Sequence, residues 1–243
     1  MRASICTLSV RNWDFTDILA RLARQTHQDF EWVLVDYFYD ENRQRLAELA
    51  AEANIRLCHL PPAPGGQRYM RNIAGNRNWA VAHTTGDVVI FLDDYAIINR
   101  TFIADHLRLT AQNIISCGQM WAVNQVLPMP YQLSSSGSPW SIEHVMQGIR
   151  LTHPDVCEED HRNVLLERPA EPKPVLGNEW TYTGNLGIPI DILLALNGFD
   201  PRLSSRNEDC DFGLRAAAAG FQIQFNPQAV SLNLSTTGIP CKY

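Results

Sequence analysis

The sequence contains no long hydrophobic run. No stretch of its 243 residues approaches the roughly 18 consecutive apolar residues of a membrane-spanning helix. The first residues, Met1–Val10, also lack the apolar core of a secretory signal peptide. We therefore expect no transmembrane segment and a cytoplasmic location.

Positive charge is also limited. The 20 Lys and Arg residues are outnumbered by 26 Asp and Glu residues, and no basic run offsets the formal net charge of -6. Nucleic acids attract clustered positive charge, so this balance disfavours a nucleic-acid partner, although a local groove stays possible.

Cysteine is present but follows no motif. The six cysteines form no C-x-x-C pair and no disulfide-scaffold spacing, so we expect reduced thiols. Hydrophobic residues make up 45% of the chain and charged residues 19%, which are values typical of globular proteins. Length and composition together predict one compact domain over residues 1–243.

Short apolar runs alternate with helical patterns in the first half of the chain, as in α/β folds. The run Asp87–Leu92 is almost entirely apolar, which indicates a mostly parallel central sheet flanked by helices on both faces. We therefore predict a Rossmann-like α/β domain. The predicted strands are Arg2–Leu8, Glu31–Asp36, Ile55–Leu60 and Asp87–Leu92. Three helices are predicted between them: one that begins at Asp14 or Thr16, one over Asn42–Ala53 and one over Gln67–His83.

The alternation breaks down between Cys117 and Gly177. Prolines and a serine-rich stretch predict long loops there, and loops of this length usually carry function or are disordered. The elements predicted in and after this region are helices near Ser141–Ile149, Glu158–Glu167 and Ile188–Leu196, a helix ending at Ala219, and a strand near Gln222–Phe225.

Two adjacent carboxylates, Asp93 and Asp94, follow the apolar run directly. Ligands of open α/β sheets bind at the carboxyl ends of the strands. Neighbouring carboxylates repel each other unless a proton or cation neutralises them, and hard divalent ions take oxygen ligands together with substrate phosphates. The pair therefore indicates a metal-bound diphosphate. The alternative is that one Asp caps a turn and the other is solvated.

A second acidic cluster begins at Glu208 and Asp209, at the predicted start of a helix. A carboxylate placed there can act as a general base toward a hydroxyl group. It can also simply stabilise the helix dipole. Upstream, Trp180 precedes a Gly184–Asn185 turn, a combination that suits a sugar platform or, equally, a core tryptophan.

These segments, in this order, resemble family-2 glycosyltransferases of the GT-A fold. The resemblance covers most of the chain apart from residues 117–177. It rests on an opening strand and helix followed by FEWVLVD, and then on GNRNWAVAHTTGDVVIFLDDY, TGNLGIPIDILLALNGFD and NEDCDFGLRAAAAGF. It implies a nucleotide-sugar-binding part over about residues 1–116 and an acceptor-binding part over about residues 117–243.

The resemblance also implies roles for individual residues. Donor contacts would come from Thr7 near the first strand's end, Asp36 at the base or ribose, Arg77 at the diphosphate, Asp93 at the ribose and sugar, and Gly184 and Asn185 along the sugar. On the acceptor side, Asp209 would be the catalytic base with Glu208 beside it, and Trp180 would contact the acceptor. Asp94 would hold the metal, Mn²⁺ or Mg²⁺.

The sequence departs from the family pattern at three positions. Tyr95 stands where a third acidic residue is usual. The segment YFYD after Asp36 replaces a second Asp and small residues, which places Tyr37 where it can stack on a base. Asn233 lies at or near the position of a metal-binding His, and its amide oxygen can also ligate a hard cation.

The implied reaction is an inverting, metal-dependent transfer of a sugar from a nucleotide-diphosphate sugar, with a UDP-sugar favoured, to an acceptor hydroxyl. The acceptor stays open among a glycan, a lipid, a protein and a modified nucleobase. Two other classes also stay open. One is a catalytically inactive nucleotide-sugar-binding protein, and the other is a nucleotidyltransferase, which also uses carboxylates and a metal.

Overall fold

The computed structural model describes residues 1–12, 15–64, 72–123, 157–158, 181–203 and 207–234. Its helices are α1 (Thr16–Leu22), α2 (Tyr39–Glu52), α3 (Ile73–Val81), α4 (Phe102–Thr110), α6 (Ile190–Ala195) and α7 (Glu208–Ala218). Its strands are β1 (Ala3–Ser9), β2 (Phe30–Asp36), β3 (Leu57–Leu60), β4 (Val88–Leu92), β5 (Ala96–Ile98), β6 (Ile115–Val123), β7 (Cys157–Glu158), β8 (Asn185–Pro189) and β9 (Ile223–Leu234).

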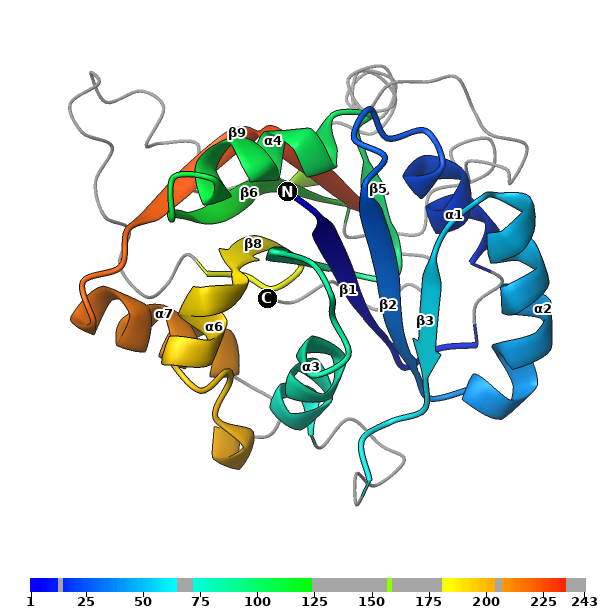
Figure 1. The fold of residues 1–243 in the computed structure, drawn as a ribbon, viewed down its shortest axis with the longest axis horizontal. Coiled ribbons are helices and arrows are strands. Elements are labelled where there is room, and N and C mark those ends of the chain that lie inside the picture. The colour runs from blue at the N-terminus through cyan, green and yellow to red at the C-terminus, as the bar shows by residue number, and fades with distance from the viewer. Residues whose placement is uncertain (13–14, 65–71, 124–156, 159–180, 204–206, 235–243) are drawn as a thin grey trace.

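The described strands form one mixed sheet in the order β3-β2-β1-β4-β8-β6-β9-β5, with β7 paired to β6 (Figure 1). The first four strands run parallel, because each is followed by a crossover before the next one pairs. Strand β8 then joins β4 in the antiparallel direction. The predicted α/β fold with a central sheet is confirmed, and its parallel half corresponds to the alternating first half of the sequence.

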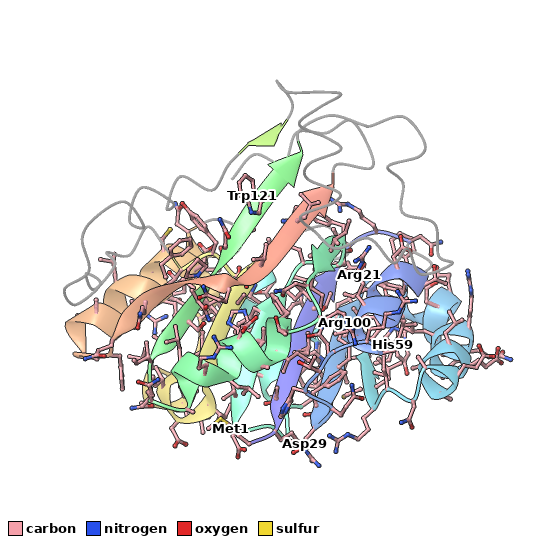
Figure 2. The ribbon with its side chains drawn as sticks, turned by 90° about the horizontal axis from the view of Figure 1, so that it is seen from above. Met1, Arg21, Asp29, His59, Arg100 and Trp121 are labelled. Atoms are coloured by element: carbon pink, nitrogen blue, oxygen red, sulfur yellow. The ribbon has the colours of Figure 1, made fainter. Side chains whose placement is uncertain are left out.

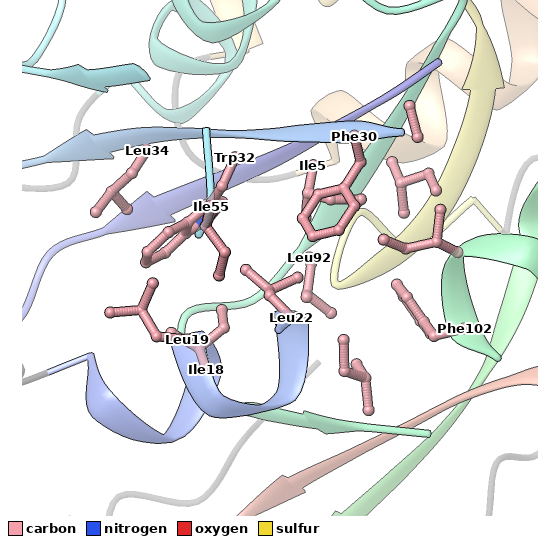
Figure 3. Close-up of a cluster of buried hydrophobic side chains, with 14 of the residues drawn as sticks. Ile5, Ile18, Leu19, Leu22, Phe30, Trp32, Leu34, Ile55, Leu92 and Phe102 are labelled. Carbon is pink, nitrogen blue, oxygen red and sulfur yellow. The ribbon is translucent and has the colours of Figure 1, made fainter. Parts of the chain in front are cut away.

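Helices cover both faces of this sheet, and the sheet separates two apolar clusters (Figure 1). On one face, α1, α2 and α4 pack against alternate residues of the strands, such as Trp32 and Ile90. Figure 3 shows Ile18, Leu19 and Leu22 of α1 on this face. On the other face, α3, α6 and α7 pack against the intervening residues of the same strands. Apolar residues on both sides of β2 and β4 explain their uninterrupted hydrophobic sequences.

Two expectations for the later elements are wrong. Residues 117–123, predicted as loop, continue β6 because β9 pairs along this stretch and β7 pairs with Ala122 and Val123. Ile188 and Pro189, predicted as helical, belong to β8, and the helix starts only at Ile190. The expected helix Ser141–Ile149 and most of Glu158–Glu167 lie outside the described residues. Among the described helices, none is long and apolar enough to cross a bilayer.

The parallel register of β1 and β4 brings the carboxyl ends of these two strands together. Cys6 of β1 lies opposite Phe91 of β4, so Thr7 to Ser9 and the residues after Leu92 reach the same edge of the sheet. Helix α3 packs beside β1 at this edge. The fold therefore places Asp93 and Asp94 next to the end of β1, at the side where α/β sheets bind ligands.

Candidate functional site

A cavity of about 320 Å³ opens at this edge of the sheet. Its walls come from the end of β1, one side of α3, the end of β4 with the turn after it, and the residue preceding Gly184. The lining residues are Cys6, Thr7, Leu8, Val10, Arg11, Ile73, Asn76, Arg77, Ala80, Phe91, Leu92, Asp93, Asp94, Tyr95 and Thr183. Four of the predicted site residues, Thr7, Arg77, Asp93 and Asp94, therefore share one cavity.

Asp94 is held on the β1 side of the cavity. Its side chain is only 5% exposed, and Ser9 donates its hydroxyl to one carboxylate oxygen at 2.7 Å. The Arg11 guanidinium lies 3.7 Å from the other oxygen and stacks over the Tyr95 ring, 4.7 Å from the ring centre. Ser9 and Arg11 thus hold the Asp94 carboxylate in place at the cavity wall.

Asp93 faces the opposite wall, where the chain before β8 comes close. The Asn233 amide donates to an Asp93 carboxylate oxygen at 3.2 Å. A side-chain carbon added at Gly184 would lie 2.7 Å from the same oxygen and 2.7 Å from the terminal carbon of Met120. Glycine is therefore required at position 184 if Asp93 is to keep this position.

Arg77 connects the cavity to helix α7. It lines the cavity and forms an ion pair with Glu208, whose side chain is 6% exposed. Glu208 is followed by Asp209, whose carboxyl group is partly buried. Burial raises the pKa of the Asp209 carboxyl, the Glu208 charge raises it further, and the Arg77 charge opposes both. A raised pKa makes Asp209 a stronger base than an ordinary aspartate.

Other predicted site residues are not among those that line the cavity. Asp36 is fully buried, and its carboxylate accepts hydrogen bonds from the Phe38 amide and the Asn42 side chain, with a His59 ring nitrogen at 3.2 Å. Asp209 follows Glu208, which pairs with the lining residue Arg77. Trp180 lies outside the described residues.

Asn185 belongs to a buried polar network behind the site. Its amide oxygen lies 2.8 Å from a ring nitrogen of His106, and its amide nitrogen donates to the Gln119 and Ala229 carbonyl groups at 2.9 Å. The other His106 ring nitrogen lies 2.9 Å from the Ser116 hydroxyl. These contacts tie β8 to α4, β6 and β9, and thereby hold the preceding Gly184 beside Asp93.

Sequence reasoning missed Ser9, Arg11, Asn76 and Thr183 as residues of the site. Ser9 and Arg11 had a usable signal, because they directly follow the first strand, whose end meets the end of β4. Asn76 and Thr183 also had one, because they directly precede the predicted site residues Arg77 and Gly184. The approach of Thr183 to the cavity, however, depends on how β8 enters the sheet.

The donor atoms fit a divalent cation that shares its coordination with a ligand. Asp93 and Asp94 supply two carboxylates and Asn233 an amide, and Mg²⁺-type sites use one or two carboxylates together with substrate phosphates. Within the described part of the chain, no group of three or more His, Cys, Asp or Glu side chains could hold a metal by itself. The residues therefore suit a metal that arrives with a phosphate ligand.

Comparison with known proteins supports this architecture. The model of Glycosyl transferase family 2 matches residues 14–132. TarS 1-349 from S. aureus in complex with UDP superposes with a TM-score of 0.62 at 16% identity, covering 96% of this chain and 60% of that one. No curated protein matches the sequence.

A second solved structure gives the same picture. The mannosyltransferase PcManGT from Pyrobaculum calidifontis, in complex with GDP-Man and Mn²⁺, superposes with a TM-score of 0.59 at 15% identity, covering 96% of this chain and 56% of that one. The chain thus spans less than two thirds of either solved chain. Residues 14–132 thus resemble Glycosyl transferase family 2, and the chain shares the GT-A fold of these solved structures.

Proposed function

We propose that this chain transfers a sugar from a nucleotide-diphosphate sugar, with a UDP-sugar favoured, to an acceptor hydroxyl, with inversion and with the help of a divalent metal. The observation that carries the proposal is the single cavity that gathers a guanidinium, Arg77, and two carboxylates, Asp93 and Asp94. The solved neighbours that hold UDP, UDP-GlcNAc and GDP-Man support a nucleotide-sugar donor.

On the donor side, the Arg77 guanidinium is positioned to bind a diphosphate oxygen, and Asp93 to accept hydrogen bonds from ribose or sugar hydroxyls. Asp94 would hold the metal, with Asn233 as a further ligand. A bound Mn²⁺ or Mg²⁺ would neutralise charge on the diphosphate leaving group. Gly184 and Thr183 form the wall beside Asp93, where the sugar would lie.

On the acceptor side, Asp209 would take the proton from the attacking hydroxyl. Because burial raises its pKa, it titrates at higher pH than an ordinary aspartate, and only its deprotonated form can act as a base. Activity should therefore rise with pH as Asp209 ionises. One direct displacement by the hydroxyl inverts the anomeric carbon. The part of the chain after residue 116 would bind the acceptor.

A binding screen tests the donor half of the proposal. Melting temperatures are measured with UDP, GDP and ADP sugars, with and without Mn²⁺, for the wild type and for Asp94→Asn. A ligand at 100 times its Kd adds about 2.7 kcal/mol of stability. We expect metal-dependent stabilisation by a UDP-sugar that is lost in Asp94→Asn. Stabilisation by none of these ligands would refute the proposed donor site.

The exposed variant Asp191→Asn serves as a matched control, because Asp191 lies in the first turn of α6 and outside the lining of the cavity. It should respond to the nucleotide sugar as the wild type does. Binding without release of nucleoside diphosphate in any acceptor screen would instead favour an inactive nucleotide-sugar-binding protein.

A further inference from the structure

Tyr37, the residue directly after β2, is better suited to bind a nucleobase than Asp36, the last residue of β2. Both Asp36 carboxylate oxygens already have partners within the chain, from Phe38, Asn42 and His59, and the side chain is fully buried. Figure 2 labels His59, on β3, beside the strands of the parallel half of the sheet. Asp36 thus stabilises the start of α2 and the β3 edge. It has no exposed surface with which to meet a base.

The adjacent residue, Tyr37, instead contacts a residue of the cavity wall. Its phenol oxygen accepts a hydrogen bond from the Asn76 side chain at 2.8 Å, and Asn76 lines the cavity. The Tyr37 backbone amide donates to the Ser9 carbonyl at 3.0 Å, which anchors it next to the end of β1. The tyrosine ring is half-buried. Tyr37 therefore bridges β1 and α3, the two elements that line this side of the cavity.

The direction of the Tyr37–Asn76 hydrogen bond is fixed by a third group. The Ala63 backbone amide donates to the Asn76 amide oxygen at 2.8 Å. Since a backbone N–H can only donate, the Asn76 oxygen must face Ala63, and its NH₂ group must face Tyr37. The Tyr37 oxygen is therefore an acceptor toward Asn76, and its own proton is available to a ligand.

We propose that the Tyr37 hydroxyl, held by Asn76, selects the donor base by donating to a base carbonyl oxygen. This assignment rests on the proposed nucleotide-sugar function and names the base class of its donor. Uracil and guanine present a carbonyl oxygen on the edge that pairs, whereas adenine presents an amino group there. Burial raises the pKa of the Tyr37 phenol, so the proton is retained at neutral pH.

The test compares two conservative variants in the same segment. Tyr37→Phe removes the donor, and Tyr39→Phe removes a hydroxyl two residues later, on the ring that packs against His59, 4.7 Å between ring centres. Calorimetry measures the Kd of UDP and of ADP for the wild type and both variants. The readout is the ratio of the two affinities, which a general loss of stability would not change.

We expect the wild type to prefer UDP, and Tyr37→Phe to lose about fivefold to tenfold of that preference while Tyr39→Phe keeps it. An unchanged ratio in Tyr37→Phe, an equal loss in both variants, or equal binding of UDP and ADP by the wild type would overturn the assignment. Failure of the wild type to bind UDP, GDP or ADP would instead overturn the proposed function on which it rests.

Discussion

At the scale of single residues, the site depends on close approaches that few side chains permit. Gly184 lies against Asp93, and Asp94 is fixed by Ser9 and Arg11. Charges on these residues are partly shielded from water, so their interactions are stronger than at the surface. Conservative substitutions at these residues should therefore affect binding and catalysis more than they affect the stability of the fold.

Gly184→Ala tests the close approach to Asp93. The added methyl group would lie 2.7 Å from the Asp93 carboxylate oxygen and 2.7 Å from Met120, so one of them must move. We expect at least a tenfold loss of kcat/KM, since misplacement of about 1 Å in a site can cost about a hundredfold. Steady-state kinetics measures the loss. Thermal unfolding of the same variant shows whether the change is local, and unaltered kinetics would contradict the assigned role.

Asp36→Asn tests whether this carboxylate is structural. The substitution replaces an acceptor by an NH₂ group that faces the donors of Phe38, Asn42 or His59. We expect a loss of about 1–3 kcal/mol in the free energy of unfolding, measured by urea denaturation. The control is Asp40→Asn, because Asp40 is exposed in the first turn of the same helix and should change stability by less than about 0.5 kcal/mol. Equal effects would contradict the structural role.

At the scale of elements, two contacts hold the site together across the sheet. The Arg77–Glu208 ion pair joins α3 to α7, and the His106–Asn185 contact joins α4 to β8. Neither contact follows from sequence pattern, because its partners are 131 and 79 residues apart. Both are shielded from solvent, so each should be measurable by mutation.

A double-mutant cycle tests the ion pair between α3 and α7. The Arg77 and Glu208 side chains are 15% and 6% exposed, so removing one partner leaves a poorly solvated charge. We expect a coupling free energy of about 1–3 kcal/mol from the variants Arg77→Met, Glu208→Gln and their combination. The exposed Arg202–Asp200 pair, 88% and 20% exposed, is the control and should give less than about 1 kcal/mol. Equal couplings would refute the predicted strength of the α3–α7 link.

The buried His106 predicts how stability depends on pH. Burial lowers the pKa of His106 to about 4, below its usual 6.5, and the hydrogen bond to Asn185 only partly opposes this. Between these values the unfolded chain binds a proton that the folded chain does not, so stability falls as the pH is lowered. We expect a loss of roughly 2 kcal/mol from pH 8 to pH 5 from this group. Urea unfolding at both pH values measures it, and the loss should shrink in His106→Gln; an identical loss in that variant would contradict the account.

At the scale of the whole molecule, the sequence predicted the α/β fold and its parallel half. The apolar run Asp87–Leu92 and the alternating elements before it carry local signals that do not depend on distant contacts. The antiparallel half was harder to predict. Strand β6 continues through residues 117–123 because β9 and, at its end, β7 pair with it, and both come later in the chain.

The site, like the fold, could be predicted only in part. The carboxylates Asp93 and Asp94 follow a buried strand, so their place at the sheet edge could be read from sequence alone. The surroundings of Asp36 and Asn185 could not, because side chains distant in sequence, such as His59 and His106, contact them. The resemblance suggested donor contacts for both residues, whereas the structure shows their polar groups bonded within the chain.

Release of nucleoside diphosphate from a nucleotide sugar is the most direct test of the proposed activity. The wild type, Asp94→Asn and Asp209→Asn are incubated with UDP-, GDP- and ADP-sugars and Mn²⁺, with water and with a panel of glycan, lipid and peptide acceptors. We predict release by the wild type from a UDP-sugar, strongly reduced in both variants. No release from any donor, or equal release by all three proteins, would contradict the account.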